Sequence, residues 1–416
     1  MTLGRDGRLL FATRAVRMFA YGLASVVLVL YLAALGLPDP AIGLVLTLTL
    51  LGDAAISLWL TTHADRVGRR RVLLAGALLM CLAGLGFALT SVLAVLALAA
   101  TIGVISPSGN EVGPFLAVEQ AALSQTIGDR ARTRVFAWFN LTGSFATAAG
   151  ALAGGGVAGW LIADGRAPID AYRVVIVLYA CLGLVLALLF GRVSAQVEVA
   201  QAPDLTIARR LGLHRSRGIV ARLGALFALD AFGGGLVVQS LVAYWFHLRF
   251  GTDVAVLGAV FFGANLLAGI SALAASWIAD RIGLVRTMVF THLPSNILLA
   301  LVPLMPTLPL AIVVLLARFS ISQMDVPTRQ SYTMAVVDPD ERSAAAGVTG
   351  IARSLGASVS PLIAAPLFGV ASLAALPFLL AGGLKIGYDI LLYRSFRSTR
   401  PEHERPNSPP PGRARA

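Results

Sequence analysis

Charged side chains lie inside several long apolar stretches of this sequence, where ionisable groups are rare. They are Asp53, Glu111, Asp230, Arg318, Asp325, Arg329, Arg353, Lys385 and Asp389. A carboxylate in such surroundings can take up a proton, and an Arg or Lys can pair with it or bind a charged group. The sequence contains no G-x-S-x-G or H-E-x-x-H motif, phosphate-binding loop or Cys/His cluster. We therefore expect proton transfer and charge recognition, with no enzyme activity, cofactor or metal site.

One apolar stretch, residues 309–334, holds several of these groups. Its polar residues recur at spacings of 4, 3 and 4 and are Arg318, Ser322, Asp325 and Arg329. On a continuous helix this spacing puts them on one face, which must meet protein or water. Pro327 lacks an N–H, so we expect a carbonyl near Gln323 to be free to bind another group.

The stretches that carry these charges have the length of membrane spans. The chain is 57% hydrophobic and 13% charged, with a mean hydropathy of +0.81, whereas soluble domains have about 25% charged residues. About 20 apolar residues cross a bilayer, and twelve such runs are present. They are 12–36, 42–62, 72–91, 93–119, 135–162, 172–191, 221–246, 254–278, 287–305, 309–334, 343–369 and 372–393. The sequence predicts an all-α membrane protein with twelve transmembrane helices.

The basic residues predict how the chain is oriented. Of the 33 Lys and Arg, 26 fall on one side of the predicted membrane, three on the other and four within spans. Positive charge collects in cytoplasmic loops, so we expect both termini on the cytoplasmic side of a cell membrane. The net charge of +12 is then a matter of topology, and we expect no nucleic-acid partner. Arg5 and the arginines after it lead directly into the first span with no cleavage site, so we expect no cleaved signal peptide.

Two repeated motifs indicate that the chain consists of one six-span unit that occurs twice. The run DRVGRRR at 65–71 recurs as DRIGLVR at 280–286, 215 residues later. Glu111-Val112, with Pro114 after it, is echoed at nearly the same offset by Asp325-Val326-Pro327. The run SPSGNEVGPF at 106–115 interrupts its span, and the echo predicts discontinuous helices at paired positions, which are typical of a transporter's binding site. We therefore expect two six-helix bundles, at 1–191 and 221–396, joined by a cytoplasmic linker at 192–220. Residues 397–416 read as a disordered cytoplasmic tail.

The chain has twelve predicted spans, both termini on the cytoplasmic side and a D-R-x-G-R-R-R loop. In these features it resembles the major facilitator superfamily over nearly its whole length. The resemblance implies two pseudo-symmetric six-helix bundles with a binding site between them. It also implies a gating role for the loop residues, in which Asp65 is a latch between the halves. The residues concerned are Asp65, Arg66, Gly68, Arg69, Asp280, Arg281 and Gly283.

The fifth span resembles the glycine signature of drug:proton antiporters. Its pattern is Gly143-x6-Gly150-x3-Gly154-Gly155, followed by Ala158-Gly159. The other reading of these small residues is close helix packing alone.

In the resembled fold, spans one, four, seven and ten line the central cavity. This implies a substrate and proton site that contains Arg17, Tyr21, Glu111, Asp230, Arg318, Asp325 and Arg329. The same carboxylates could instead form a gate whose salt bridges lock one side. Asp53 is a further candidate for proton coupling. Arg14 and Arg17 could also reach the membrane interface, and Lys385 and Asp389, one turn apart, read as a neutralising pair.

The function predicted from these features is secondary transport of a small solute by alternating access. We expect proton-coupled efflux by antiport, carried out by a monomer in the lipid bilayer. The alternatives are a proton symporter or facilitator that imports a metabolite, and a non-transporting receptor on the same fold. The sequence does not identify the solute.

Overall fold

The structure is a computed structural model that describes residues 4–126, 129–194, 197–198, 214–338 and 341–396. Of the helical side chains, those of residues 62, 65, 66, 125–134 and 343 are outside the description. The described residues form helices and connecting turns, with no β-strand among them. Most of the predicted linker and the whole predicted tail lie outside the described residues.

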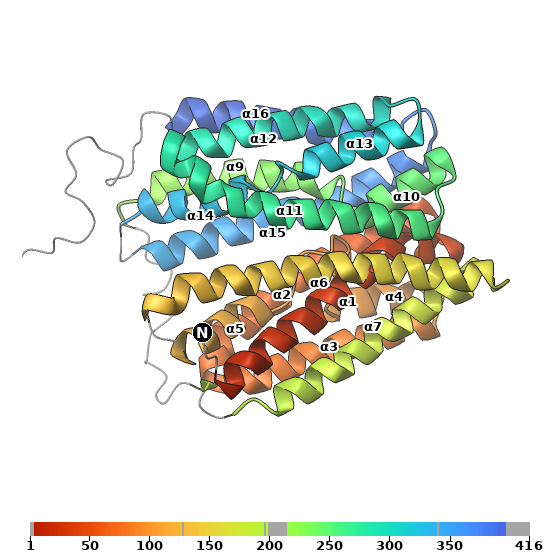
Figure 1. The fold of residues 1–416 in the computed structure, drawn as a ribbon, viewed down its shortest axis with the longest axis horizontal. Helices are drawn as coiled ribbons and strands as arrows, with labels where there is room; N and C mark the ends of the chain where they lie inside the picture. The colour runs from red at the N-terminus through yellow and green to blue at the C-terminus, as the bar shows by residue number, and fades with distance from the viewer. Residues whose placement is uncertain (1–3, 127–128, 195–196, 199–213, 339–340, 397–416) are drawn as a thin grey trace, which may run out of the picture. The chain divides into compact units, whose positions relative to one another are not determined.

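The first half of the described chain contains seven helices (Figure 1). They are α1 (Arg5–Ala34), α2 (Asp39–Val67), α3 (Arg69–Leu89), α4 (Leu93–Ile102), α5 (Phe115–Thr126), α6 (Asp129–Ala163) and α7 (Pro168–Gly191). Pro168 stands at the first position of α7, where its missing N–H costs no helical hydrogen bond. Gly68 separates α2 from α3 with φ of +104°, a conformation that glycine adopts without a steric penalty.

The second half repeats this order with more interruptions. Its helices are α9 (Arg217–Gly235), α10 (Gln239–Phe250), α11 (Val254–Ile282), α12 (Leu284–Leu301), α13 (Leu308–Phe319), α14 (Asp325–Ala335), α15 (Arg342–Gly369) and α16 (Leu376–Phe396). A 3-10 turn, Val302–Leu304, extends α12. Gly283, with φ of +85°, separates α11 from α12 just as Gly68 separates α2 from α3.

The predicted spans agree closely with the observed helices, and the exceptions are informative. In the described part of the chain, ten helical segments are long and apolar enough to cross a membrane. The two predicted spans missing from this set are the fourth and the tenth. Each is divided into two shorter helices, α4 and α5 in one case and α13 and α14 in the other. The twelve-helix prediction holds if each divided pair counts as one span.

A third interruption, at residues 236–238, was not expected. The predicted span at 221–246 is divided there into α9 and α10. Three consecutive glycines, Gly233, Gly234 and Gly235, precede the break. Glycine is a poor helix former, so a run of three weakens the helix where the chain turns.

The described chain divides into two compact units. Unit one contains the first half together with Gly235–Leu266 and Ser358–Pro377, and unit two contains Asp204–Gly234, Leu267–Ala357 and the C-terminal part from Phe378. Helices of both halves therefore pack together inside unit one. The predicted boundaries of the two six-helix bundles remain a prediction.

Glycines on α6 allow close helix contacts within unit one. A Cβ on Gly150 would lie 2.0 Å from the Phe19 carbonyl oxygen of α1, and one on Gly154 would lie 2.4 Å from that of Leu23. The next face of α6 meets α11, where a Cβ on Gly155 would lie 2.6 Å from Cα of Gly258. The glycine pattern predicted from the sequence therefore packs α6 against two helices, as small residues do in membranes.

Candidate functional site

The interruption of the fourth span is an ordered loop at residues 103–114. The Ser106 hydroxyl donates to the Asn110 carbonyl over 2.7 Å. Gly109 and Gly113 have φ of +70° and +81°, which side chains rarely tolerate. This loop, and not a continuous helix, positions Glu111.

Two arginines of α1 hold the Glu111 carboxylate. Arg14 donates to one carboxylate oxygen in a short hydrogen bond, and Arg17 Nη2 lies 2.9 Å from the other. The side chains of Arg14 and Arg17 are 6% and 0% exposed, whereas that of Glu111 is 18% exposed. The arginines therefore do not reach the membrane interface, because burial beside a carboxylate gives their charge a partner.

Glu119, on α5, completes what we call the Glu111 cluster, made of Arg14, Arg17, Glu111 and Glu119. Arg17 donates to both oxygens of Glu119, over 2.7 and 2.8 Å, and both side chains are 0% exposed. The Thr13 hydroxyl adds a third bond, over 2.9 Å. Sequence reasoning missed Glu119 because it stands at the predicted end of a span. An acid that directly follows the apolar run Phe115–Val118 was the available signal.

Tyr21 lies one turn further along α1 and is fully buried. Its hydroxyl donates to the Val112 carbonyl over 3.1 Å. Tyr21 therefore anchors the same loop that carries Glu111. The predicted cavity residues of the first half, Arg17, Tyr21 and Glu111, are thus brought together at this loop.

Asp53, on α2, holds the other end of the loop. Its Oδ1 accepts the Gly113 N–H over 2.6 Å and the Ser57 hydroxyl over 3.2 Å. The side chain is half-buried, and no cation among the described residues forms an ion pair with it. Asp53 therefore differs from Glu111, which has two guanidinium partners.

The tenth span is interrupted at residues 320–324, so its charged residues do not share a continuous helix. Asp325 is the first residue of α14 and pairs with Arg329 over 2.8 Å. Pro327 lies in the first turn of α14, where backbone N–H groups have no helical partner. The predicted loss of a hydrogen bond at Pro327 was therefore wrong, because the helix begins only two residues before it.

Arg318 lies on the other side of this break, in the last turn of α13. Its guanidinium stacks 4.8 Å from the Phe319 ring centre, and its Nε has no hydrogen-bond partner in the described structure. The predicted one-face stripe is thus divided. Arg329 joins the carboxylates, and Arg318 does not.

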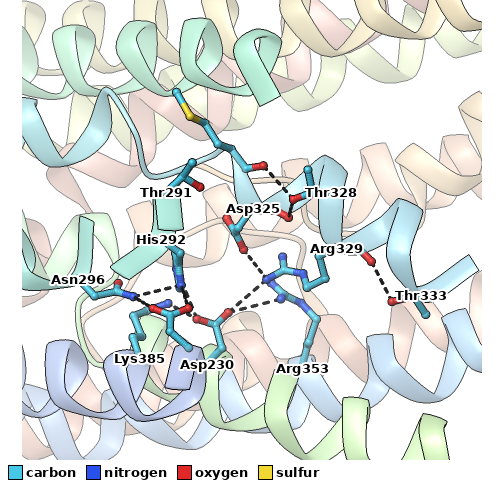
Figure 2. A network of polar contacts seen from close by, with 12 residues as sticks. Asp230, Thr291, His292, Asn296, Asp325, Thr328, Arg329, Thr333, Arg353 and Lys385 are labelled. Carbon is cyan, nitrogen blue, oxygen red and sulfur yellow. Dashed lines mark hydrogen bonds and ion pairs between the residues drawn. The ribbon is translucent and has the colours of Figure 1, made fainter. Parts of the chain in front are cut away.

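Asp230, on α9, is the centre of a second group of charges (Figure 2). Its carboxylate lies 2.6 Å from Lys385 Nζ, 3.3 Å from Arg329 Nη1 and 3.6 Å from Arg353 Nη1. We call this group the Asp230 cluster; it comprises Asp230, His292, Asn296, Asp325, Arg329, Arg353, Lys385 and Asp389. All of its members belong to unit two.

The partner of Lys385 was predicted wrongly. Lys385 binds Asp230, 155 residues away, and not Asp389 on its own helix. Asp389 instead accepts hydrogen bonds from His292 Nδ1 and Asn296 Nδ2, each over 2.9 Å. Helical spacing brings Lys385 and Asp389 near each other, but the nearby acid on α9 offers the better geometry.

The predicted gating loops are only partly described. The side chains of Asp65 and Arg66 are outside the description. After Gly68, the backbone N–H groups of Arg69 and Arg70 donate to Glu198 over 2.7 and 3.0 Å, which caps the start of α3. In the second copy, Asp280 and Arg281 are exposed, and the Arg281 guanidinium stacks 3.4 Å from the Trp277 ring centre.

A carboxylate also caps the start of α9. Glu341 accepts the backbone N–H groups of His214, Arg215 and Ser216, the last two over 2.8 and 2.9 Å. These bonds, with the His214 N–H as the largest contribution, lower the pKa of Glu341 from an ordinary 4.5 to about 2. Glu198 and Glu341 therefore fasten the two ends of the linker region, each within its own half of the sequence.

No group of His, Cys, Asp and Glu side chains in the described residues could hold a metal ion. The site consists of ion pairs and hydrogen bonds on interrupted helices. Such an arrangement can bind protons and charged groups. The architecture and the site together are those of a membrane transporter.

Comparison with known proteins identifies the family. The chain matches the Major Facilitator Superfamily over residues 10–361 and again over 223–415, and it belongs to that family. It is 31% identical over 418 residues to the uncharacterized membrane protein YJR124C of Saccharomyces cerevisiae, covering 93% of each chain.

Solved structures share the fold at lower identity. The nucleoside transporter NupG is 13% identical with a TM-score of 0.72, over 95% of this chain and all of its own. A D-xylose-proton symporter is 16% identical with a TM-score of 0.71, over 93% and 97% of the two chains. The protein is thus a multi-pass membrane protein with a transporter fold, and it is not an enzyme.

Proposed function

We propose that this protein exports a small solute in exchange for protons and that Asp53 is the group at which the two compete. The observation that carries this proposal is the isolation of Asp53 from cations. Glu111, Glu119, Asp230 and Asp325 each lie beside an Arg or Lys. Among the described residues, the carboxylate of Asp53 accepts hydrogen bonds from the Gly113 N–H and the Ser57 hydroxyl and has no cationic partner.

An acid without a counter-ion can bind either a proton or a cationic group, but not both at once. Inside the membrane, one of the two must offset the cost of the bare charge, which is at least about 2.5 kcal/mol. Mutually exclusive binding at one carboxylate is the requirement for exchange of proton against solute. This argument favours antiport, and it favours solutes that carry a positive charge.

The position of Asp53 also offers a route for coupling. Its bond to Gly113 ties α2 to the loop that carries Glu111. Protonation removes the charge that strengthens this bond, so it would loosen the loop. Glu111, Asp230 and their partners would then act as salt bridges that open and close, which is the gating alternative predicted from the sequence.

The remaining predictions fit this proposal. Single chains of this family act as transport units, so we propose a working monomer. The excess of basic residues in alternate loops supports cytoplasmic termini in a cell membrane. We propose no nucleic-acid partner and no cofactor.

Proton release on ligand binding tests the proposal. The purified protein in weakly buffered detergent would be mixed with tetraphenylphosphonium, a permanent cation, and the pH followed with an indicator dye. The proposal expects proton release by the wild type and none by Asp53→Asn, in which the amide oxygen can still accept the Gly113 N–H. Ser57→Ala, which retains the carboxylate, is the matched control and should still release protons.

The sign of the proton change separates the alternatives. Proton uptake on binding would indicate symport, and binding without a proton change would indicate a facilitator. Proton release that persists in Asp53→Asn would show that another group is responsible. Flux in proteoliposomes with an imposed pH gradient would then give the direction of transport.

A further inference from the structure

The imidazole of His292 stands between two carboxylates in the middle of unit two (Figure 2). Its Nδ1 lies 2.9 Å from Asp389 Oδ1, and its Nε2 lies 3.7 Å from Asp230 Oδ1. The side chain is 7% exposed, and the ring of Tyr388 packs edge-on against it at 5.9 Å. The two nitrogens of one ring thus face oxygens from two different helices, α16 and α9.

The two carboxylates favour a protonated ring. Carboxylate oxygens are acceptors only, so a ring nitrogen needs a hydrogen to meet one favourably. A neutral imidazole has a single N–H and would turn a lone pair toward one of the carboxylates. The doubly protonated ring donates from Nδ1 to Asp389 and turns its other N–H toward Asp230, 3.7 Å away. The Asn296 amide nitrogen, 3.1 Å from Nδ1, also donates to Asp389.

The surrounding charges point to the same form. The groups that face the ring from the neighbouring helices are Asp230 of α9, Asp325 and Arg329 of α14, Arg353 of α15, and Lys385, Tyr388 and Asp389 of α16. Lys385 and Arg353 lie at Asp230, and Arg329 is shared between Asp230 and Asp325. Asp389 has no Arg or Lys partner in the described structure; its contacts are His292 and Asn296. A proton on His292 places a positive charge directly beside Asp389.

We propose that His292 and Asp389, with Asp230 behind the ring, form a proton-binding site that is separate from Asp53. Asn296 positions Asp389 by donating to its second oxygen over 2.9 Å. The bound proton converts His292 into a cation that joins α12 to α16 and α9. Loss of the proton would leave Asp389 buried beside a neutral ring and would release the contact with Asp230. The site stands on unit two alone, so it does not depend on the antiport proposal.

Nitrogen chemical shifts of the histidine rings test this site directly. The full-length protein would be labelled with ¹⁵N-histidine, solubilised in detergent and titrated, and the His292 signals assigned by their loss in His292→Gln. At pH 7 the proposal expects a doubly protonated ring for His292. In Asp389→Asn, the ratio of doubly to singly protonated ring should fall by about tenfold or more, because a neighbouring opposite charge has been removed. His247→Gln, on α10, is the control and should leave the His292 signals unchanged.

Two results would overturn the proposal. One is a neutral His292 ring in the wild type at pH 6, a measurement that requires no variant to fold. The other is an unchanged His292 titration in a correctly folded Asp389→Asn protein. Neither result depends on Asp53, so a failed proton-release experiment and a failed histidine titration have separate meanings.

Discussion

The two charged clusters pair their cations with carboxylates in different ways. In the Glu111 cluster, Arg17 is shared by two acids, so the loss of Glu111 would still leave it paired with Glu119. In the Asp230 cluster, one carboxylate serves Lys385, Arg329 and Arg353. We call the first arrangement a chain, because one cation connects two acids. We call the second a hub, because several cations share one acid. The partly exposed Glu111 is therefore easier to release from its partners than the shared carboxylate of Asp230.

The helix interruptions beside the two clusters differ in length and in glycine content. The first break is a loop of twelve residues, 103–114, with two glycines at positive φ. The second is five residues, 320–324, and contains no glycine. Glu111 therefore sits on irregular backbone, while Asp325 starts a helix and pairs with Arg329 one turn later. The repeated acid-Val motif marks an interruption in both halves but assigns a different role in each.

Removal of the hub should have the largest effect. Asp230→Asn keeps the shape of the side chain but leaves buried Lys385 without its carboxylate, while Arg329 keeps Asp325 and Arg353 is partly exposed. Breaking a buried ion pair by removing one partner costs about 3–5 kcal/mol. We expect a loss of stability in that range, measured by unfolding in a denaturing detergent.

Glu111→Gln is the matched comparison for this prediction. It leaves Arg17 paired with Glu119 and replaces the charged partner of Arg14 by an amide oxygen that can still accept its hydrogen bond, so it should cost about 1–2 kcal/mol. Equal losses for the two variants would show that the distinction between hub and chain is wrong.

The loop of the first break should be sensitive at Gly113. Its φ is +81°, and a Cβ there would lie 2.9 Å from Phe115 Cδ2 and 3.0 Å from Val104 Cγ1. Gly113→Ala should therefore cost about 1–2 kcal/mol of stability, read as a lower melting temperature in detergent. Gly156→Ala, on α6, meets no atom within 4 Å and is the control. A Gly113→Ala protein as stable as that control would contradict the role of this backbone conformation.

The smallest effect should come from Glu341, outside the spans. Its folded-state pKa of about 2 lies below the ordinary 4.5, so its stabilising effect is present above pH 4.5 and is lost as the pH falls toward 2. Glu341→Gln should lower the melting temperature slightly at pH 7, and the difference from the wild type should shrink with acidification below pH 4.5. Asp338→Asn alters only an exposed 3.9 Å pair with Arg215 and serves as the control. A difference that is constant with pH would exclude this explanation.

Hydrophobic run length predicted the spans well because each helix must cross the same apolar thickness. Pro and Gly around Glu111, and the echo at Asp325, indicated the interruptions of the fourth and tenth spans. The break between α9 and α10 had a signal in Gly233–Gly235, but the apolar residues on both sides masked it.

Partners across the fold were harder to predict than the charged residues themselves. The pairing of Lys385 with Asp389 was inferred from spacing on one helix, which is visible in a sequence, whereas its contact with Asp230 depends on how α9 packs against α16. The burial of Arg17 could not be inferred, because its partner Glu119 was taken as the residue at the end of the fourth span. The predicted stripe at Arg318 assumed an unbroken helix.

Glu198 and Glu341 each cap a helix on their own side of the segment 199–213. Glu198 lies before that segment and binds the start of α3, while Glu341 binds the residues that follow it, at the start of α9. Neither cap relies on chain continuity through the segment. A gene split within codons 199–213 would therefore give two fragments that each keep their own cap, which makes this segment the natural place to divide the protein for co-expression or to insert a reporter.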